Sequence, residues 1–273
     1  MKQMNDLEAF ARLIQALAPW RQQLIFIGGW GHRLHRLDPR ANQPDHQPVF
    51  TRDTDLAFAN KEPIEGDIKQ ALMQHGFQEE LSGDHRPPAA HYTLGDEARG
   101  FYAEFLTPLA GSGYKRSGEA DATMTKAGIS AQKIRHLDIL LLDPWVIGLG
   151  QQEGVPLPGR MDVQVANPLC FMVQKFLIQH HRPPSKKAQD ILYIYDTIEL
   201  FGALLDDFNA HWHARVAPAL GQKLADDVQR LSVQTFDEVN DLVRAAALIP
   251  VDRNLPAEQI QATCRYALER MLR

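Results

Sequence analysis

The stretch that decides the fold is Thr51-Arg52-Asp53-Thr54-Asp55-Leu56-Ala57-Phe58. Its two carboxylates stand one residue apart, and an apolar run with strand propensity follows them. Because alternate side chains of a strand share a face, we expect Asp53 and Asp55 on one face and Leu56 and Phe58 in the core. Two neighbouring anions repel and are costly to bury unless a cation lies between them. A hard divalent ion such as Mg2+, acting with substrate phosphates, would supply that cation.

For an isolated D-x-D, the alternative is a surface turn, since Asp is a common turn residue. The residues upstream favour a site. Leu24-Ile25-Phe26-Ile27 is a short apolar strand that leads directly into Gly28-Gly29. Glycines at the end of a buried strand let the backbone turn sharply and let a ligand approach closely. A short helix is predicted over residues 30–37, and its first N–H groups would face an anion above the glycines. Residues 38–50 are predicted to form a loop.

Glu104 is the third acid of interest. It stands within the apolar and aromatic run 101–106, which is predicted to be a strand in a hairpin with residues 91–94. An acid in the middle of such a strand either faces solvent or has a function, because charged side chains are rarely buried without a partner. If this strand lies beside that of Asp53 and Asp55, the three acids can converge on one cluster of metal ions.

The rest of the chain divides into a mixed half and a helical half. An amphipathic helix is predicted over residues 63–75, a loop or flap over 111–132, and strands over 139–142 and 162–165. From Pro168 onward the apolar residues follow the helical period. Helices are predicted over residues 169–179, 186–205, 220–231, 236–248 and 256–272. The change of period predicts two domains, 1–166 and 167–273.

Composition excludes several classes of protein. The 273 residues are 44% hydrophobic and 23% charged, as in ordinary globular proteins. A net charge of -5 argues against a general nucleic-acid coat or a membrane-surface binder, although it is compatible with a local basic patch. No apolar run approaches the roughly 20 residues of a membrane span, and the start lacks a signal-peptide core. Cys170 and Cys264 lie far apart, which predicts free thiols in a cytoplasmic protein.

The order Ile27-Gly28-Gly29, then T-R-D-T-D-L at 51–56, then Glu104 resembles the nucleotidyltransferase superfamily, which has the DNA polymerase β-like fold. The T-x-D-x-D-L form with a helical second half is similar to AbiEii-type toxins and minimal nucleotidyltransferases. The helical half adds a run similar to the family's P…K-L…R…K/R-x-x-D pattern. It consists of Asn167-Pro168-Leu169, Gln174-Lys175-Phe176-Leu177, Arg182 and Lys186-Lys187-Ala188-Gln189-Asp190. The resemblance covers residues 24–200.

This resemblance implies an α+β fold, in which a mixed β-sheet nucleotidyltransferase domain flanked by helices precedes an all-helical C-terminal domain. It implies Mg2+ or Mn2+ as cofactor, held by Asp53 and Asp55. Glu104 would bind the metal or act as general base toward the acceptor hydroxyl. The nucleotide would be contacted by Gly28, Gly29, Lys175, Lys187 and Asp190. The alternative for Lys175 is a side chain that snorkels from a packed helix.

The implied activity is metal-dependent transfer of an NMP from an NTP to a hydroxyl acceptor, which is an RNA such as tRNA, a protein or a small molecule. The resemblance also implies a toxin of a toxin-antitoxin pair, with an antitoxin protein as partner. The lack of a long apolar run predicts no membrane association. The rival prediction is a catalytically inactive module of the same fold that binds a nucleotide or a partner. Trp30 favours the rival, because an indole after the glycines would crowd the phosphate or stack on a base.

Overall fold

The computed structural model describes residues 5–49, 51–59, 63–84, 87–95 and 100–273. Its contacts divide the chain into two compact units. The first unit is Met1–Leu37 with Thr51–Ala166, and the second is Asp38–Phe50 with Asn167–Arg273. The change to helical periodicity therefore coincides with one division, whereas the segment 38–50 groups with the helical residues and not with its sequence neighbours.

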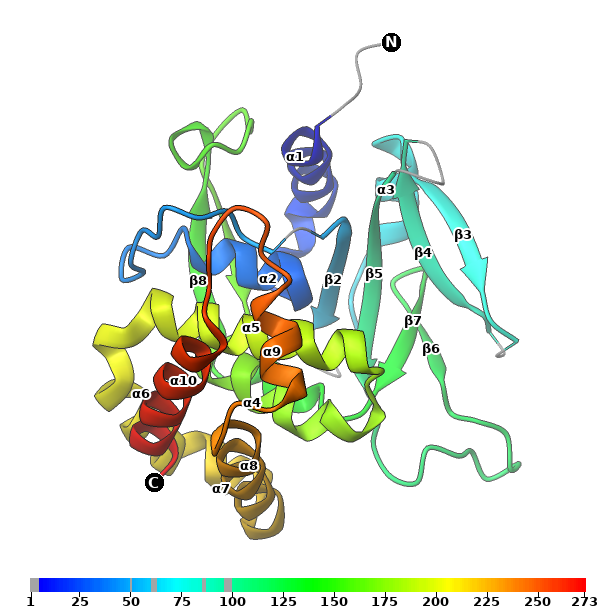
Figure 1. Ribbon diagram of the computed structural model, residues 1–273. Helices are drawn as coiled ribbons and strands as arrows, with labels where there is room; N and C mark the ends of the chain where they lie inside the picture. Colours follow the sequence, from blue (N-terminus) through cyan, green and yellow to red (C-terminus); the bar gives the residue numbers. More distant parts are fainter. Residues whose placement is uncertain (1–4, 50, 60–62, 85–86, 96–99) are drawn as a thin grey trace. The chain divides into compact units, whose positions relative to one another are not determined.

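The first unit is built on one mixed sheet (Figure 1). Its order is β3-β4-β5-β2-β1-β9-β8, and β7 also pairs with β5 and with β6. The β1–β9, β2–β5 and β5–β7 pairs are parallel, and the others are antiparallel. The strands are β1 Leu24–Ile27, β2 Asp53–Phe58, β3 Gln78–Ser82, β4 Ala89–Leu94, β5 Phe101–Pro108, β6 Thr123–Lys126, β7 Ile129–Ile134, β8 Trp145–Leu149 and β9 Met161–Val165.

One face of the sheet packs on the core of this unit. Helix α1 (Asp6–Leu17) begins at Asn5, which forms a capping box with Glu8. Its apolar face and helix α3 (Ile68–Gln74) join the alternate strand residues Phe26, Leu56 and Phe105 in one buried cluster. Because side chains alternate along a strand, the residues that precede and follow Phe26, Leu56 and Phe105 in their strands face the other side of the sheet. That other side carries the predicted acids.

Helix α2 (Gly28–His35) follows β1 directly, so the short helix predicted over 30–37 begins two residues earlier. Its N-cap residue Ile27 is extended and makes no side-chain capping bond. Three short 3-10 helices complete the first unit, at Ala18–Trp20, Asp138–Leu141 and Gln151–Glu153.

Two predictions for the first unit are wrong. The strand predicted over 139–142 is the 3-10 helix Asp138–Leu141, because a short buried apolar run does not distinguish a strand from a helical turn. The region predicted as a loop over 111–132 contains β6 and the start of β7. Ala127 and Gly128, both at positive φ, turn this hairpin. Its glycines mark turns between strands and do not indicate a flap.

The second unit consists of helices that pack on one another. Helix α5 contacts α4, α9 and α10, and α8 contacts α4 and α10. No helix is predicted between residues 205 and 220, but this stretch contains α6, a π-helical turn and α7. The bounds are α4 Pro168–Ile178, α5 Pro184–Phe201, α6 Leu205–His211, the π-turn Trp212–Val216, α7 Ala217–Leu220, α8 Gln222–Phe236, α9 Asp241–Ala247 and α10 Ala257–Leu272, with 3-10 turns at Gln179–His181 and Gly202–Leu204. No helix among the described residues is both long and apolar enough to cross a bilayer.

The segment 38–50, over its described residues, is a loop without helix or strand, as predicted. It is held to the helical unit by backbone and side-chain bonds. The amide N of Asn42 donates to the carbonyl of Leu200 at 2.8 Å, and its side-chain amide donates to the carbonyl of Glu199 at 2.8 Å. The amide N of Gln47 donates to Asp252 at 2.6 Å. Such bonds fix a loop that has little apolar side chain to bury.

Candidate active site

The three predicted acids lie on adjacent strands in register. Strand β2 runs parallel to β5, and the register pairs Asp53 with Tyr102 and Asp55 with Glu104. Residues paired in this way project to the same face of a sheet, as do residues two apart in one strand. Asp53, Asp55 and Glu104 therefore share the face opposite the buried Leu56. All three side chains are half-buried.

Gly28 lies directly against this acid row. Strand β1 pairs Ile27 with Asp55, so the chain turns into α2 beside the second aspartate. A Cβ at Gly28 would lie 1.9 Å from Oδ2 of Asp55, and Gly28 has φ +62°, a conformation that side chains disfavour. Close approach and backbone geometry therefore both require glycine. Gly29 is the second residue of α2, at its N-terminal end.

The pKa values of Glu104 and Tyr102 are shifted by burial and by the charges of neighbouring acids on this face. Burial raises the pKa of Glu104, His91 opposes that shift, and the charge of Asp53 adds to it. The pKa of Tyr102 is raised to about 12 by burial and by the charges of Asp53, Glu104 and Asp55. Tyr102 projects from the same face as Glu104, two residues away. No motif of the sequence marks Tyr102, although strand alternation alone places it on the same face as Glu104.

The donor set of this face suits a hard divalent ion, since it consists of carboxylate oxygens whose mutual repulsion a cation would relieve. The carboxylates are not drawn together as a closed site. Among the described residues, the one set of three or more His, Cys or acidic side chains with ligand atoms within 4.8 Å of one another is His46, Asp196 and Glu199. Asp53, Asp55 and Glu104 are the residues of this face that would hold such an ion.

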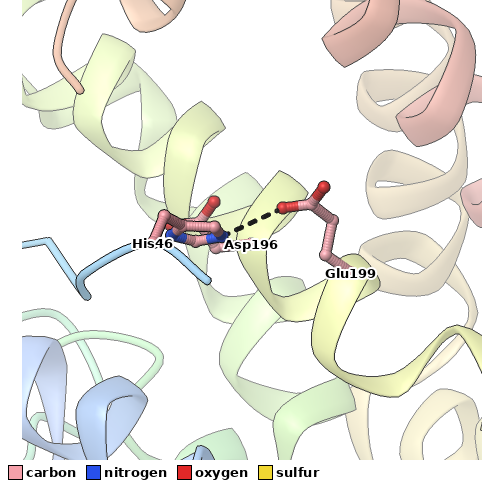
Figure 2. Close-up of side chains that lie close together, drawn as sticks. All are labelled: His46, Asp196 and Glu199. Carbon is pink, nitrogen blue, oxygen red and sulfur yellow. Dashed lines mark ion pairs between the residues drawn. The ribbon is translucent and has the colours of Figure 1, made fainter. Parts of the chain in front are cut away.

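The set His46, Asp196 and Glu199 lies in the helical unit and is held by an arginine. Figure 2 shows His46 directed at Glu199, whose Oε2 is 3.4 Å from the imidazole Nε2. Arg253 donates to Glu199 at 3.1 Å and also bonds Asp196 and His46. A guanidinium already supplies the positive charge that these acids need. We therefore interpret this cluster as an ion-pair network that ties the 38–50 segment to α5 and not as a metal centre.

The side chain of Trp30, which follows Gly28 and Gly29 in α2, belongs to the core. Its side chain is 1% exposed. The indole stacks on Phe10 of α1 with ring centroids 4.0 Å apart, meets Phe101 edge to face, and carries Arg33 at 4.6 Å from its centroid. The expectation that Trp30 crowds a phosphate or stacks on a base is therefore wrong, and the feature that favoured an inactive module is removed.

The predicted site residues of the helical unit differ in burial: Lys175 and Asp190 are buried, and Lys187 is half-buried. Lys175 of α4 is 6% exposed and forms a 3.0 Å ion pair with Asp190 of α5, which Arg182 also binds at 2.9 Å. The ammonium of Lys175 lies over the rings of Phe171 and Tyr193. Lys187 is half-buried. Lys175 and Asp190 thus meet one another in the interior of their unit.

Residues 5–217 match a protein-family model described as Nucleotidyltransferase. Among solved structures, the chain is similar to MenT4, a nucleotidyltransferase toxin from Mycobacterium tuberculosis H37Rv, with 14% identity, a TM-score of 0.39, and coverage of 97% of this chain and 82% of that chain. No curated protein matches the sequence.

Proposed function

The chain belongs to the nucleotidyltransferase family, and from this premise we propose that it binds an NTP, transfers the NMP to a hydroxyl acceptor and releases pyrophosphate. The supporting observation is the register that sets Glu104 opposite Asp55, with Gly28 against the same aspartate. A glycine turn and three acids on one sheet face bring together the parts that hold a triphosphate and the parts that hold cations.

In this proposal each residue of the first unit has a defined task. The backbone of Gly28 and Gly29 and the first N–H groups of α2 hold the phosphates, because uncapped N–H groups and the helix dipole favour an anion. Asp53 and Asp55 would hold the divalent ion, Mg2+ or Mn2+, which when bound would neutralise phosphate charge and lower the pKa of the acceptor hydroxyl.

Glu104 accepts the proton of the acceptor hydroxyl or completes the cation site. The acceptor oxygen forms a new bond to the α-phosphorus, and the bond from that phosphorus to the pyrophosphate oxygen breaks. The raised pKa of Glu104 suits a proton acceptor, since a base works best when its pKa approaches the working pH. Positioning and charge neutralisation supply most of such catalysis, so few protein groups are required.

The nucleotide contacts of Lys175, Lys187 and Asp190 remain part of the proposal. Lys187 is half-buried, whereas Lys175 and Asp190 are buried, so Lys187 can reach a ligand without breaking a buried ion pair. Lys175 and Asp190 would contact the nucleotide only if their buried pair opens or presents an edge, so we assign them first to holding α4 against α5. Variants of Lys175 and Lys187 separate nucleotide binding from a structural role.

The acceptor class and a toxin role are finer parts of the proposal. The acceptor is an RNA such as tRNA, a protein or a small molecule, and toxicity would be relieved by an antitoxin protein. Both ideas come from the T-x-D-x-D-L motif and the helical half. Expression from an inducible promoter with wild type and with Asp55→Ala tests toxicity: growth arrest by wild type alone supports it, and equal growth rejects it.

The activity test uses purified protein with each α-labelled NTP, Mg2+ or Mn2+, and total RNA or total protein. We expect label on one acceptor class with wild type and none with Asp53→Ala or Asp55→Ala. Transfer by both variants at the wild-type rate would reject the site. Nucleotide binding without transfer by wild type, under all acceptors tried, would support the rival function, a binding module of the same fold.

A further inference from the structure

The acid row continues across two more strands of the same sheet face. The register pairs Asp55 with Glu104, Glu104 with His91 of β4, and His91 with Glu80 of β3. Residues directly opposite on paired strands share a face and lie within side-chain contact distance. Four strands therefore carry one line of ionisable groups, Glu80, His91, Glu104 and Asp55. The opposite face at the same strands is the apolar core.

The outer end of this line is fixed by hydrogen bonds. The imidazole Nε2 of His91 lies 2.9 Å from Oε2 of Glu80, and the hydroxyl of Thr93 donates to Oε1 of Glu80 at 2.7 Å. The hydrogen bond from Thr93, together with His91, lowers the pKa of Glu80. An ionised carboxylate only accepts, so Nε2 of His91 carries the proton. Glu80 thus fixes both the orientation and the tautomer of the imidazole.

His91 is the register partner of Glu104 on the adjacent strand. Its ring lies 5.9 Å from the ring of Tyr102, edge to face, and its charge acts on Glu104 against the effect of burial. The His91 side chain is 23% exposed, which leaves it partly protected from water. Glu104 has three rotatable side-chain bonds, and a fixed neighbour on the next strand limits the directions it can take.

We propose that His91, anchored by Glu80, is a positioning residue that holds the Glu104 carboxylate toward Asp53 and Asp55 for cation binding and NMP transfer. The inference rests on the proposed function, because Glu104 is assigned there to the cation site or to the acceptor proton. It extends that site by two residues, His91 and Glu80, that no motif of the sequence marks. Side chains outside the ligand set of a metal site commonly orient the side chains that bind the metal.

The alternative is that His91 and Glu80 are only a cross-strand pair on a half-exposed part of the sheet, with no role in the acid site. Exposed ion pairs contribute little, and Glu80 and His91 would then affect only local stability. The two interpretations differ in whether the effect of removing His91 depends on the presence of Glu104. If His91 acts through Glu104, its removal has no further effect once Glu104 cannot ligate. If it is merely structural, the two effects are independent and multiply.

The experiment is a double-mutant cycle with wild type, His91→Ala, Glu104→Gln and the double variant. Two quantities are measured: Mn2+ affinity by electron paramagnetic resonance, and kcat for NMP transfer. We expect His91→Ala to weaken Mn2+ binding by about tenfold, the low end of the range for outer-shell partners of a metal ligand, with a comparable loss in kcat. In the Glu104→Gln background the same change should alter either quantity by less than about twofold, within the additivity error for uncoupled effects.

Matched variants control for folding and for charge. His91→Gln keeps a hydrogen-bonding group of similar length and should recover most of the loss. Glu80→Gln should act in the same direction as His91→Ala but more weakly. Glu79→Gln is the control, because Glu79 is the next residue of β3 but faces the core side, where it binds Lys69 and Tyr92. It should leave Mn2+ affinity unchanged. Circular dichroism and thermal unfolding report whether each variant is folded.

The outcomes separate this inference from the proposed function. Wild-type Mn2+ affinity and kcat in His91→Ala, or fully multiplicative effects in the cycle, would overturn the positioning role while transfer by wild type stands. Coupled Mn2+ affinities in a protein that transfers no NMP would overturn the function and keep the positioning role. Absence of both Mn2+ binding and transfer in wild type would overturn both.

Discussion

Asp55 and Glu104 lie directly opposite each other on the parallel strands β2 and β5, so two like charges are paired across the sheet. Directly opposed like charges destabilise a sheet. Burial and the charge of Asp53, the other aspartate of β2, both raise the pKa of Glu104. A protein that keeps such a pair at half-buried positions keeps it at a cost in stability, and a bound cation would remove that cost.

The first prediction is that Glu104→Gln stabilises the protein when no divalent ion is present. The gain should be roughly 0.2–1 kcal/mol, the range for one cross-strand pair. In wild type, added Mg2+ should raise the melting temperature, and in Glu104→Gln that rise should be smaller. Differential scanning fluorimetry with and without Mg2+ measures both. Asp162→Asn, an exposed change on β9, is the control and should shift neither value. Destabilisation of Glu104→Gln without Mg2+ would contradict the prediction.

The second prediction concerns Gly28→Ala. The new methyl group would lie 1.9 Å from Oδ2 of Asp55 on a backbone at φ +62°, so the aspartate must move. We expect a loss of roughly 1–3 kcal/mol in the free energy of unfolding, the cost of a strained backbone position, together with loss of Mg2+-dependent stabilisation. Urea unfolding and NMP transfer measure the two effects. Gly159→Ala, where a Cβ meets nothing within 4 Å, should be neutral in both assays.

The third prediction separates a core Trp30 from a base-stacking one. Trp30→Ala should lose about 3–5 kcal/mol in the free energy of unfolding, as for other buried aromatic truncations. Trp30→Phe should keep the stack on Phe10, lose less stability, and bind NTP with the wild-type dissociation constant. Chemical denaturation and isothermal titration calorimetry supply the measurements. A large loss of NTP affinity in a stable Trp30→Phe protein would place the indole in the site.

The fourth prediction compares two lysines of the helical unit. Lys175→Met leaves Asp190 buried with Arg182 as its remaining partner, and it should cost up to about 3–5 kcal/mol of stability, as for a broken buried pair. Lys187→Met, at a half-buried position, should change stability by less than about 0.5 kcal/mol. If Lys187 contacts the nucleotide, its variant will raise KM for NTP while stability is kept. Equal stability losses in the two variants would contradict the assignment.

The fifth prediction is a pH dependence. Burial raises the pKa of Asp196, and the hydrogen bond and charge of Arg253 oppose that rise. Arg253→Gln removes the opposition, so the folded-state pKa of Asp196 rises further above its unfolded value. A raised carboxyl pKa means that the folded state binds more protons, and stability falls as pH rises through the window between the two pKa values. The variant should lose about 3–5 kcal/mol at pH 8 and less at pH 5.

Urea unfolding at the two pH values checks this prediction. Arg265→Gln is the matched control, because Arg265 pairs with Asp237 and Glu269 at an exposed position. Its loss should stay below about 1 kcal/mol at both pH values. A deficit in Arg253→Gln that is independent of pH would show that Asp196 does not titrate in this window.

The sequence contains more information about the sheet than about the site. The pairing of 91–94 with 101–106, the β1 strand and the helical second half follow from period and punctuation, and the structure confirms them. The strand prediction over 139–142 is wrong because a run of four apolar residues is too short to show whether its period is that of a strand or of a helical turn. The helical turns between residues 205 and 220 are not predicted, because the residues between the two predicted helices show no clean apolar repeat.

Within the candidate site, the face shared by the three acids follows from strand alternation once β2 and β5 are known to be neighbours. That adjacency joins residues far apart in the chain, and no local pattern encodes it. For the same reason His91 and Glu80 could not be found, since a histidine in a strand has no spacing signature. Trp30 was misjudged because its position after the glycines is local, whereas its burial depends on Phe10 and Phe101.

The grouping of residues 38–50 with the helical residues makes the two halves of the gene inseparable by a single cut. A polypeptide that ends at Ala166 would carry this loop without the Leu200 carbonyl and the Asp252 carboxylate that it binds. The complementary polypeptide would leave Glu199 and Asp196 facing Arg253 without His46. Expression of either fragment alone should therefore yield insoluble or protease-sensitive material, and co-expression of both should restore a complex that purifies as one species.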